Sequence, residues 1–154
     1  MTPAATLPAP RGCTNFKLRQ LTRRVSRDYD AVLADTGLKT SQYSLLNAVD
    51  KLGPLRPADL AAQMRLDAST LTRNLQPLVA QGWVVVGAGA DLRSRVVSLT
   101  DTGRAKRTQA HAAWKKAQQA LNARLGADRV AQLHALIDDC LARLEDGRVD
   151  EDLP

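Results

Sequence analysis

Five polar side chains with complementary hydrogen-bonding groups lie within eight residues near the middle of the chain. They are Ser69, Thr70, Thr72, Arg73 and Gln76. Leu71, Leu75 and Leu78 recur at steps of four and three, which predicts a helix whose apolar stripe leaves the polar set on the outside. Short hydroxyls, one guanidinium and one amide can approach base edges and phosphate oxygens without steric bulk. The pattern therefore predicts a helix face that reads nucleic acid.

A second charged cluster lies between two β-prone runs. Trp83–Val86 and Val96–Leu99 are rich in valine, and glycines separate them, which predicts a β-hairpin with a long tip. The tip carries Asp91, Arg93 and Arg95. Arginine is attracted by the negative potential of a narrow minor groove. We expect Asp91 to hold the Arg93 guanidinium in one orientation through a charge-assisted hydrogen bond.

The composition is that of one globular domain with an anionic partner. The chain has 154 residues, of which 44% are hydrophobic and 25% charged, and its formal net charge is +6. Two cysteines are too few for a disulfide framework, which favours a reducing compartment. No apolar run approaches the roughly 20 residues that span a bilayer, and residues 1–12 lack the pattern of a secretory signal. We therefore expect a cytoplasmic protein without a membrane partner.

Apolar spacing predicts six helices around this hairpin. They cover residues 13–36, 40–52, 57–65, 68–81 and 101–125, with a last helix after residue 128. The caps and stops expected from residue type are Gly37, Thr40, Gly53, Pro57, Asp67, Gly82, Thr100 and Gly126. Leu52 and Val79 are expected among the buried residues. Two consecutive short helices followed at once by a hairpin predict a winged helix-turn-helix, so double-stranded DNA is the expected partner.

Three helices carry regular apolar stripes. The stripe of the first helix consists of Leu18, Leu21, Val25, Tyr29 and Val32. The stripes of the last two consist of Ala110, Trp114, Ala117 and Leu121, and of Val130, Leu133, Ile137, Cys140 and Leu144. Such spacing in two consecutive helices suits helix–helix packing between subunits, and packing within one chain is the alternative.

Two stretches carry a more specific pattern. They are LAAQMRLDASTLTRNLQPLVAQGWV at residues 60–84 and DLRSRVVSLTDTG at residues 91–103. On these residues the chain resembles the MarR (multiple antibiotic resistance regulator) family of bacterial transcription factors. The second stretch matches the family's Asp-x-Arg wing, followed by Leu-Thr-x-x-Gly at the start of a long helix. The resemblance covers about residues 13–146.

The resemblance implies a mainly α, homodimeric repressor that binds a pseudo-palindromic operator. Together with the prolines of residues 1–11 and the acidic residues at the end of the sequence, it gives the expected organisation. This comprises a flexible N-terminal arm, a helical dimerisation region in two parts, a winged helix-turn-helix DNA-binding lobe and an acidic tail. These cover residues 1–11, 12–36 with 101–146, 37–100 and 147–154, respectively. It also implies Arg93 as the minor-groove residue, and release from DNA by a small phenolic, aromatic or anionic ligand, for which Tyr29 and Tyr43 are the candidate pocket residues.

Two residues depart from what the family's fold requires. Pro77 lies inside the predicted recognition helix, where a proline removes one amide donor and costs about 3 kcal/mol in a regular helix. Arg65 lies in the turn before that helix, where a glycine is frequent. If the backbone is left-handed at this turn, a non-glycine residue there costs roughly 1–2 kcal/mol.

The mode of sensing has a thiol alternative. Cys13 lies at the predicted start of the first helix, near Arg11 and Lys17, where the helix dipole favours a reactive thiolate. The alternatives are therefore a peroxide-sensing repressor that uses Cys13, or a small half-buried thiol with no chemistry. An architectural winged-helix module is a further alternative, whereas an enzyme centred on Cys13 lacks any motif that places a base. His111 and His134 have no partners at ligand spacing, so we expect no metal. The sequence also has no glycine-rich phosphate loop, nucleophile elbow or paired-carboxylate motif, so we expect no cofactor and no catalysis.

Overall fold

The computed structural model describes residues 7–146 of the chain. Residues 1–6 of the predicted N-terminal arm and the whole acidic tail at 147–154 lie outside the described residues. The elements in chain order are α1 (Thr14–Leu33), the 3-10 helix η1 (Ala34–Thr36), α2 (Thr40–Leu52), α3 (Pro57–Gln63), α4 (Ala68–Ala80), β1 (Val84–Ala88), β2 (Arg95–Leu99), α5 (Asp101–Leu125) and α6 (Ala127–Asp146). The predicted mainly α winged helix-turn-helix is confirmed.

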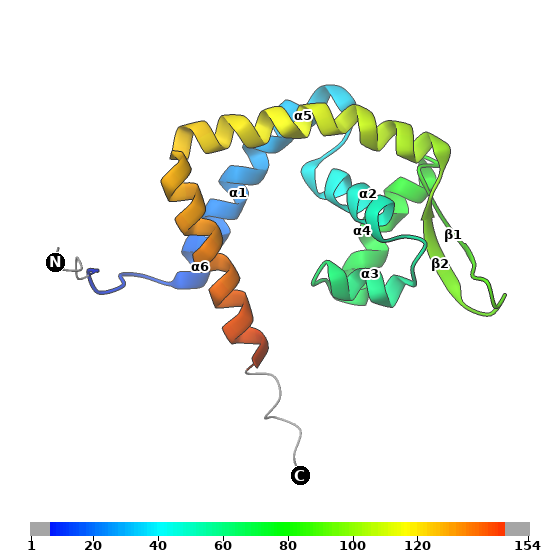
Figure 1. Cartoon of the computed structure of the whole chain (residues 1–154), viewed down its shortest axis with the longest axis horizontal. Helices are drawn as coiled ribbons and strands as arrows, with labels where there is room; N and C mark the ends of the chain where they lie inside the picture. The colour runs from blue at the N-terminus through cyan, green and yellow to red at the C-terminus, as the bar shows by residue number, and fades with distance from the viewer. Residues whose placement is uncertain (1–6, 147–154) are drawn as a thin grey trace, which may run out of the picture.

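One long helix connects two groups of elements (Figure 1). The helices α2, α3 and α4 and the β1–β2 hairpin lie around the N-terminal half of α5, and we call residues 37–100 the lobe. The helix α1 lies against α5, and α6 turns back from the far end of α5 at Gly126, whose φ is 88°. We call α1, α5 and α6 the helical region. The position of the lobe therefore depends on how it is attached to α5.

The core of the lobe forms where its elements meet. Leu46 of α2, Leu60 of α3, Leu78 of α4 and Val97 of β2 are fully buried. Burying one such side chain contributes roughly 1.5–3 kcal/mol. The hairpin is an antiparallel pair, and Leu55 adds an isolated bridge on the free side of Val97. The core therefore ties the helix-turn-helix to the base of the wing.

The recognition helix α4 has the predicted N-cap and leucine stripe, and only the prediction for Val79 differs. Asp67 is the N-cap, and Leu71, Leu75 and Leu78 are buried. Val79 is 43% exposed, so the prediction that it is buried was wrong. One residue past Leu78 is a rotation of about 100° around the helix, which turns Val79 away from the core. Pro77 does not interrupt α4, which continues to Ala80.

The start and end of α2 also differ from expectation. Thr40 was predicted as the N-cap, but Lys39 takes this position and Thr40 is the first helical residue. The cause is tertiary, because the Thr40 N–H donates to the Asp30 carboxylate of α1 at 2.7 Å. Leu52 was predicted to be buried and is 46% exposed, since it is the last residue of α2 and lies beyond the core.

Arg65 has the left-handed backbone that its position in the turn suggested, with φ of 54°. We expect Arg65→Gly to raise the free energy of unfolding by about 0.5–1 kcal/mol, because glycine adopts this conformation without the Cβ penalty. Urea unfolding measures the change. Arg65 also pairs with Glu145 at 2.7 Å, so Glu145→Gln is the control that removes this exposed ion pair alone. If the free energy of unfolding of Arg65→Gly does not exceed that of Glu145→Gln, the left-handed backbone at residue 65 does not destabilise the protein.

Candidate nucleic-acid interface

The N-terminus of α4 is organised by the Asp67 carboxylate. This carboxylate accepts hydrogen bonds from the Ser69 hydroxyl at 2.7 Å, the Thr70 N–H at 2.7 Å and the Thr70 hydroxyl at 2.9 Å. The Thr72 hydroxyl donates to the Ala68 carbonyl at 2.9 Å. Three of the predicted hydroxyls therefore have intrahelical acceptors, and their oxygens keep lone pairs for an incoming donor.

Four of the five predicted residues of α4 form one surface. Ser69, Thr72, Arg73 and Gln76 are exposed and line the same open groove of about 510 Å³. Thr70 is half-buried and does not line this groove, because it belongs to the cap. The structure thus brings together a guanidinium, an amide and two hydroxyls on one helix face.

The capping hydrogen bonds, led by the one from the Ser69 hydroxyl, lower the pKa of Asp67 from 3.8 to about 2. A carboxylate with a lowered pKa stabilises the fold above pH 3.8, and this stabilisation is lost as the pH falls from 3.8 through about 2. We therefore expect Asp67→Ala to lower the midpoint of urea unfolding at neutral pH, and the difference from wild type to shrink below pH 3.8. Asp35→Ala, which removes an exposed carboxylate of η1, is the control. A difference that stays constant down to pH 2 would contradict the role of the ionised cap.

At the wing tip, Asp91 has a different partner from the one predicted. Its carboxylate accepts from the N–H groups of Arg93 at 3.2 Å and Ser94 at 2.9 Å, and from the Ser94 hydroxyl at 2.5 Å. The hydrogen bond from the Ser94 hydroxyl is the first cause of the lowered pKa of Asp91. The expectation that Asp91 holds the Arg93 guanidinium was therefore wrong: the carboxylate orders the backbone of the turn, and so positions Arg93 through its main chain.

The two wing arginines occupy different places. Arg93 is exposed in the turn, next to Leu92, which is 83% exposed with φ of 60°. Arg95 is not at the tip but begins β2, where it is paired with Ala88. There it lines a groove of about 520 Å³ together with Pro57 and the α4 residues Thr72, Leu75, Gln76, Val79 and Ala80. Arg95 therefore lies at the base of the wing, beside the polar face of α4.

The two candidate pocket tyrosines do not share a cavity. Tyr29 donates a short hydrogen bond to the Gln118 side chain and lines a groove of about 310 Å³ between α1, α5 and α6. The Tyr43 hydroxyl of α2 lies within hydrogen-bonding distance of His111 Nδ1, at 2.8 Å. The Tyr43 ring stacks on the Trp114 ring, with centroids 5.7 Å apart. Burial raises the pKa of both phenols. The predicted pocket is therefore two separate environments.

Neither cysteine is buried in the single chain. Cys13 is exposed at the N-cap of α1. Cys140 is exposed on α6, whereas the apolar stripe predicted that it packs against another helix. Among residues 7–146, no group of three metal-ligating side chains comes together. In the same part of the chain, no helix is long and apolar enough to cross a membrane.

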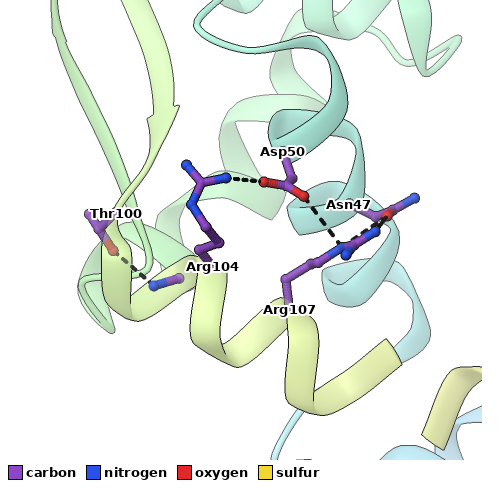
Figure 2. Close-up of polar contacts among 6 residues, drawn as sticks. Asn47, Asp50, Thr100, Arg104 and Arg107 are labelled. Carbon is purple, nitrogen blue, oxygen red and sulfur yellow. Dashed lines mark hydrogen bonds and ion pairs between the residues drawn. The ribbon is translucent and has the colours of Figure 1, made fainter. Parts of the chain in front are cut away.

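Sequence reasoning missed a polar network between the lobe and α5. Arg104 pairs with one oxygen of Asp50, and the Arg107 Nε lies 3.6 Å from the other oxygen (Figure 2). Arg107 also donates to the Asn47 side-chain oxygen at 2.8 and 3.2 Å. The signal was available, since both pairs have the i, i+3 spacing that places two side chains on one helix face.

Comparison with known proteins agrees with this geometry. A model described as "MarR family" matches residues 36–94. The Bacillus subtilis HTH-type transcriptional regulator YwoH is 30% identical over 84 residues, which are 54% of this chain and only 61% of YwoH. The multiple antibiotic resistance protein MarR of Salmonella typhimurium is 28% identical over 134 residues, which are 86% of this chain and 91% of that protein.

A solved structure shares the architecture along most of the chain. The M. tuberculosis transcriptional regulator MosR, crystallised in complex with DNA, is 30% identical with a TM-score of 0.68. The match covers 84% of this chain and 98% of the MosR chain. It includes the helical region as well as the lobe, so the similarity is not limited to the helix-turn-helix. With its winged helix, its Asp-x-Arg turn and these relatives, the chain belongs to the MarR family of transcriptional regulators.

Proposed function

We propose that the chain is a homodimeric, sequence-specific DNA-binding repressor of the bacterial cytoplasm. The observation that carries this proposal is the shared surface of α4, which presents Arg73 and Gln76 with two hydroxyls beside Arg95 of the wing. Arginine and glutamine have the donor geometry to read guanine and adenine edges in the major groove, while Arg93 at the wing tip suits the minor groove. Co-crystallisation of MosR with DNA is consistent with this assignment.

Dimerisation is supported by apolar faces that a single chain leaves exposed. Leu18 and Leu21 of α1 are 55% and 42% exposed, and Leu136 and Leu144 of α6 are 61% and 71% exposed. A monomer rarely exposes this many large apolar residues on neighbouring helices, because hydrating them costs free energy. A second copy that packs against α1 and α6 buries them and repeats the two α4 surfaces with two-fold symmetry. The corresponding operator is pseudo-palindromic, with half-sites about one helical turn apart.

The effector that we propose is a small aromatic acid or phenol. The groove beside Arg95 is largely apolar, has a cationic edge, and shares Thr72 and Gln76 with the surface proposed to contact bases. A ligand there competes directly with DNA. The groove lined by Tyr29 is the other candidate, from which a ligand acts by changing the packing of α1, α5 and α6. Cys13 is exposed, so an oxidant remains the alternative signal.

The test is a fluorescence-anisotropy titration of the purified protein with the DNA upstream of its own gene. A scrambled duplex is the control, and each titration is run at two salt concentrations. We expect about 10³-fold tighter binding to the upstream duplex. Equal, salt-sensitive binding to both duplexes contradicts sequence-specific recognition and favours the architectural module.

The effector is then sought on the complex with the upstream duplex. A panel of benzoates and phenols is added to wild type, and cumene hydroperoxide is added to wild type and Cys13→Ser. Release by an aromatic acid supports the proposed repressor. If peroxide releases the wild-type protein from DNA but does not release Cys13→Ser, the Cys13 thiol is the sensor.

A further inference from the structure

The helix α5 makes the most extensive contact between the helical region and the lobe. Two smaller links lie beside it, the hydrogen bond from the Thr40 N–H to Asp30 of α1 and the ion pair of Arg65 with Glu145 of α6. The N-terminal part of α5 contacts α2 and β2, and its remaining length contacts α1 and α6 (Figure 1). At its far end, Arg124 donates to Asp28 of α1 at 3.0 Å. In a dimer built on α1 and α6, the attachment of α5 to the lobe is therefore the main contact that sets where each recognition helix lies.

The contact between α5 and α2 includes ion pairs and hydrogen bonds, which depend on the relative position of the two helices. Asp50 uses its two carboxylate oxygens for two arginines of α5, Arg104 and Arg107, and Arg107 also donates to Asn47 (Figure 2). The side chains of Asp50 and Arg107 are only 18% and 21% exposed, so solvent screens their interaction incompletely. Arg104 is 59% exposed and contributes less.

The spacing of the four residues makes the contact specific for one register. Asn47 and Asp50 are one turn apart on α2, and Arg104 and Arg107 are one turn apart on α5. A slide of α5 by one turn, about 5.4 Å, breaks these contacts and leaves a partly buried Asp50 unpaired.

We propose that Asn47, Asp50, Arg104 and Arg107 form a positioning network that sets the distance between the two recognition helices, and thereby the half-site spacing that the dimer accepts. None of the four residues lies on the predicted reading face of α4. The network acts by holding α5 in one register against α2. This inference rests on the proposed dimeric DNA-binding function.

The first test measures spacing selectivity with Asp50→Asn, which keeps the shape of the side chain and removes its charge. The probe is a duplex selected by the wild-type protein from a random library, together with versions that gain or lose one central base pair. If the loosened lobes reach the matched spacing about one tenth of the time, affinity for the selected duplex falls about tenfold. Affinity for a single half-site changes less than twofold, and the preference over the altered spacings falls accordingly.

The matched control is Asp28→Asn. The Asp28 carboxylate also bridges two arginines, Arg24 at 3.3 Å and Arg124 at 3.0 Å, but all three lie within the helical region. We expect it to keep the wild-type spacing preference. Arg104→Gln, at a more exposed position, gives a second variant if Asp50→Asn lowers the melting temperature strongly. Unchanged selectivity in a folded Asp50→Asn protein, or an equal loss on half-site and full site, overturns the proposal.

A second readout needs no DNA. Spin labels at Ala135→Cys and Gln81→Cys, in a Cys13→Ser, Cys140→Ser background diluted with excess unlabelled protein, report the distance between α6 and the lobe within one chain. Ala135 is exposed and lies opposite the apolar stripe of α6, so the label stays clear of the proposed dimer contact. We expect Asp50→Asn to broaden the distance distribution and Asp28→Asn to leave it unchanged. If Asp50→Asn broadens the distance distribution but the wild-type protein binds no duplex, the DNA-binding function is refuted and the positioning network is supported. If the wild-type protein binds its selected duplex but Asp50→Asn leaves the distribution unchanged, only the positioning network is refuted.

Discussion

Replacing Gly103 with alanine is expected to lower the free energy of unfolding by more than about 3 kcal/mol, the largest stability effect that we predict. Gly103 is buried in the first turn of α5, against the backbone of Trp83, the residue before β1. A Cβ atom at this position would lie 1.9 Å from the Trp83 carbonyl oxygen and 2.7 Å from its carbonyl carbon. Both are backbone atoms, so no side-chain rotation relieves the overlap.

The same contact holds the end of the lobe to α5. The Thr100 N–H donates to the Trp83 carbonyl at 3.1 Å, and the Thr100 hydroxyl accepts from the Gly103 N–H at 2.9 Å. An alanine at residue 103 can therefore be accommodated only if the hydrogen bonds among Trp83, Thr100 and Gly103 are broken. Thermal and urea unfolding followed by circular dichroism measure the loss.

Gly87→Ala is the matched control for Gly103→Ala. A Cβ built on Gly87 meets no atom within 4 Å, so its stability is expected to stay near that of wild type. If Gly103→Ala unfolds within about 1 kcal/mol of wild type, the close approach of α5 to the wing is not a constraint on folding.

Arg73→Ala is expected to weaken binding to the selected duplex by about 10- to 100-fold, the largest functional effect among single substitutions. Arg73 is exposed on the groove-lining face of α4, and one good bidentate contact to a base edge is worth about 1–3 kcal/mol of discrimination. The loss is therefore accompanied by relaxed specificity at one base pair of each half-site. Competition anisotropy with single-base variants of the duplex measures both effects.

Arg73→Lys separates base reading from phosphate binding. Lysine keeps the charge but lacks the planar fork, so a base-reading Arg73 loses specificity in this variant while salt-dependent affinity is largely kept. Arg143→Ala, an exposed arginine of α6 paired with Asp139, is the control and is expected to bind as wild type does. Equal losses on selected and scrambled duplexes for Arg73→Ala would show a phosphate contact instead.

Much of the architecture follows from short-range signals in the sequence. Asp67 and Thr100 cap their helices as predicted, and Gly37, Gly82 and Gly126 have the positive φ that ends a helix. These outcomes depend on hydrogen bonds and backbone preferences within a few residues, which the local sequence contains. The leucine stripe of α4 likewise determined which face of that helix is left for polar contacts.

The sequence by itself therefore determined the order of the elements, the family and the exposed face of the recognition helix. The tertiary structure decided which distant groups meet: Tyr29 with Gln118, Tyr43 with His111, and Asp50 with Arg107. Sequence spacing specifies on which face of a helix a side chain lies, but the partner depends on how two helices are rotated and shifted against each other. That rotation and shift result from the packing of the whole core, to which many residues contribute at once.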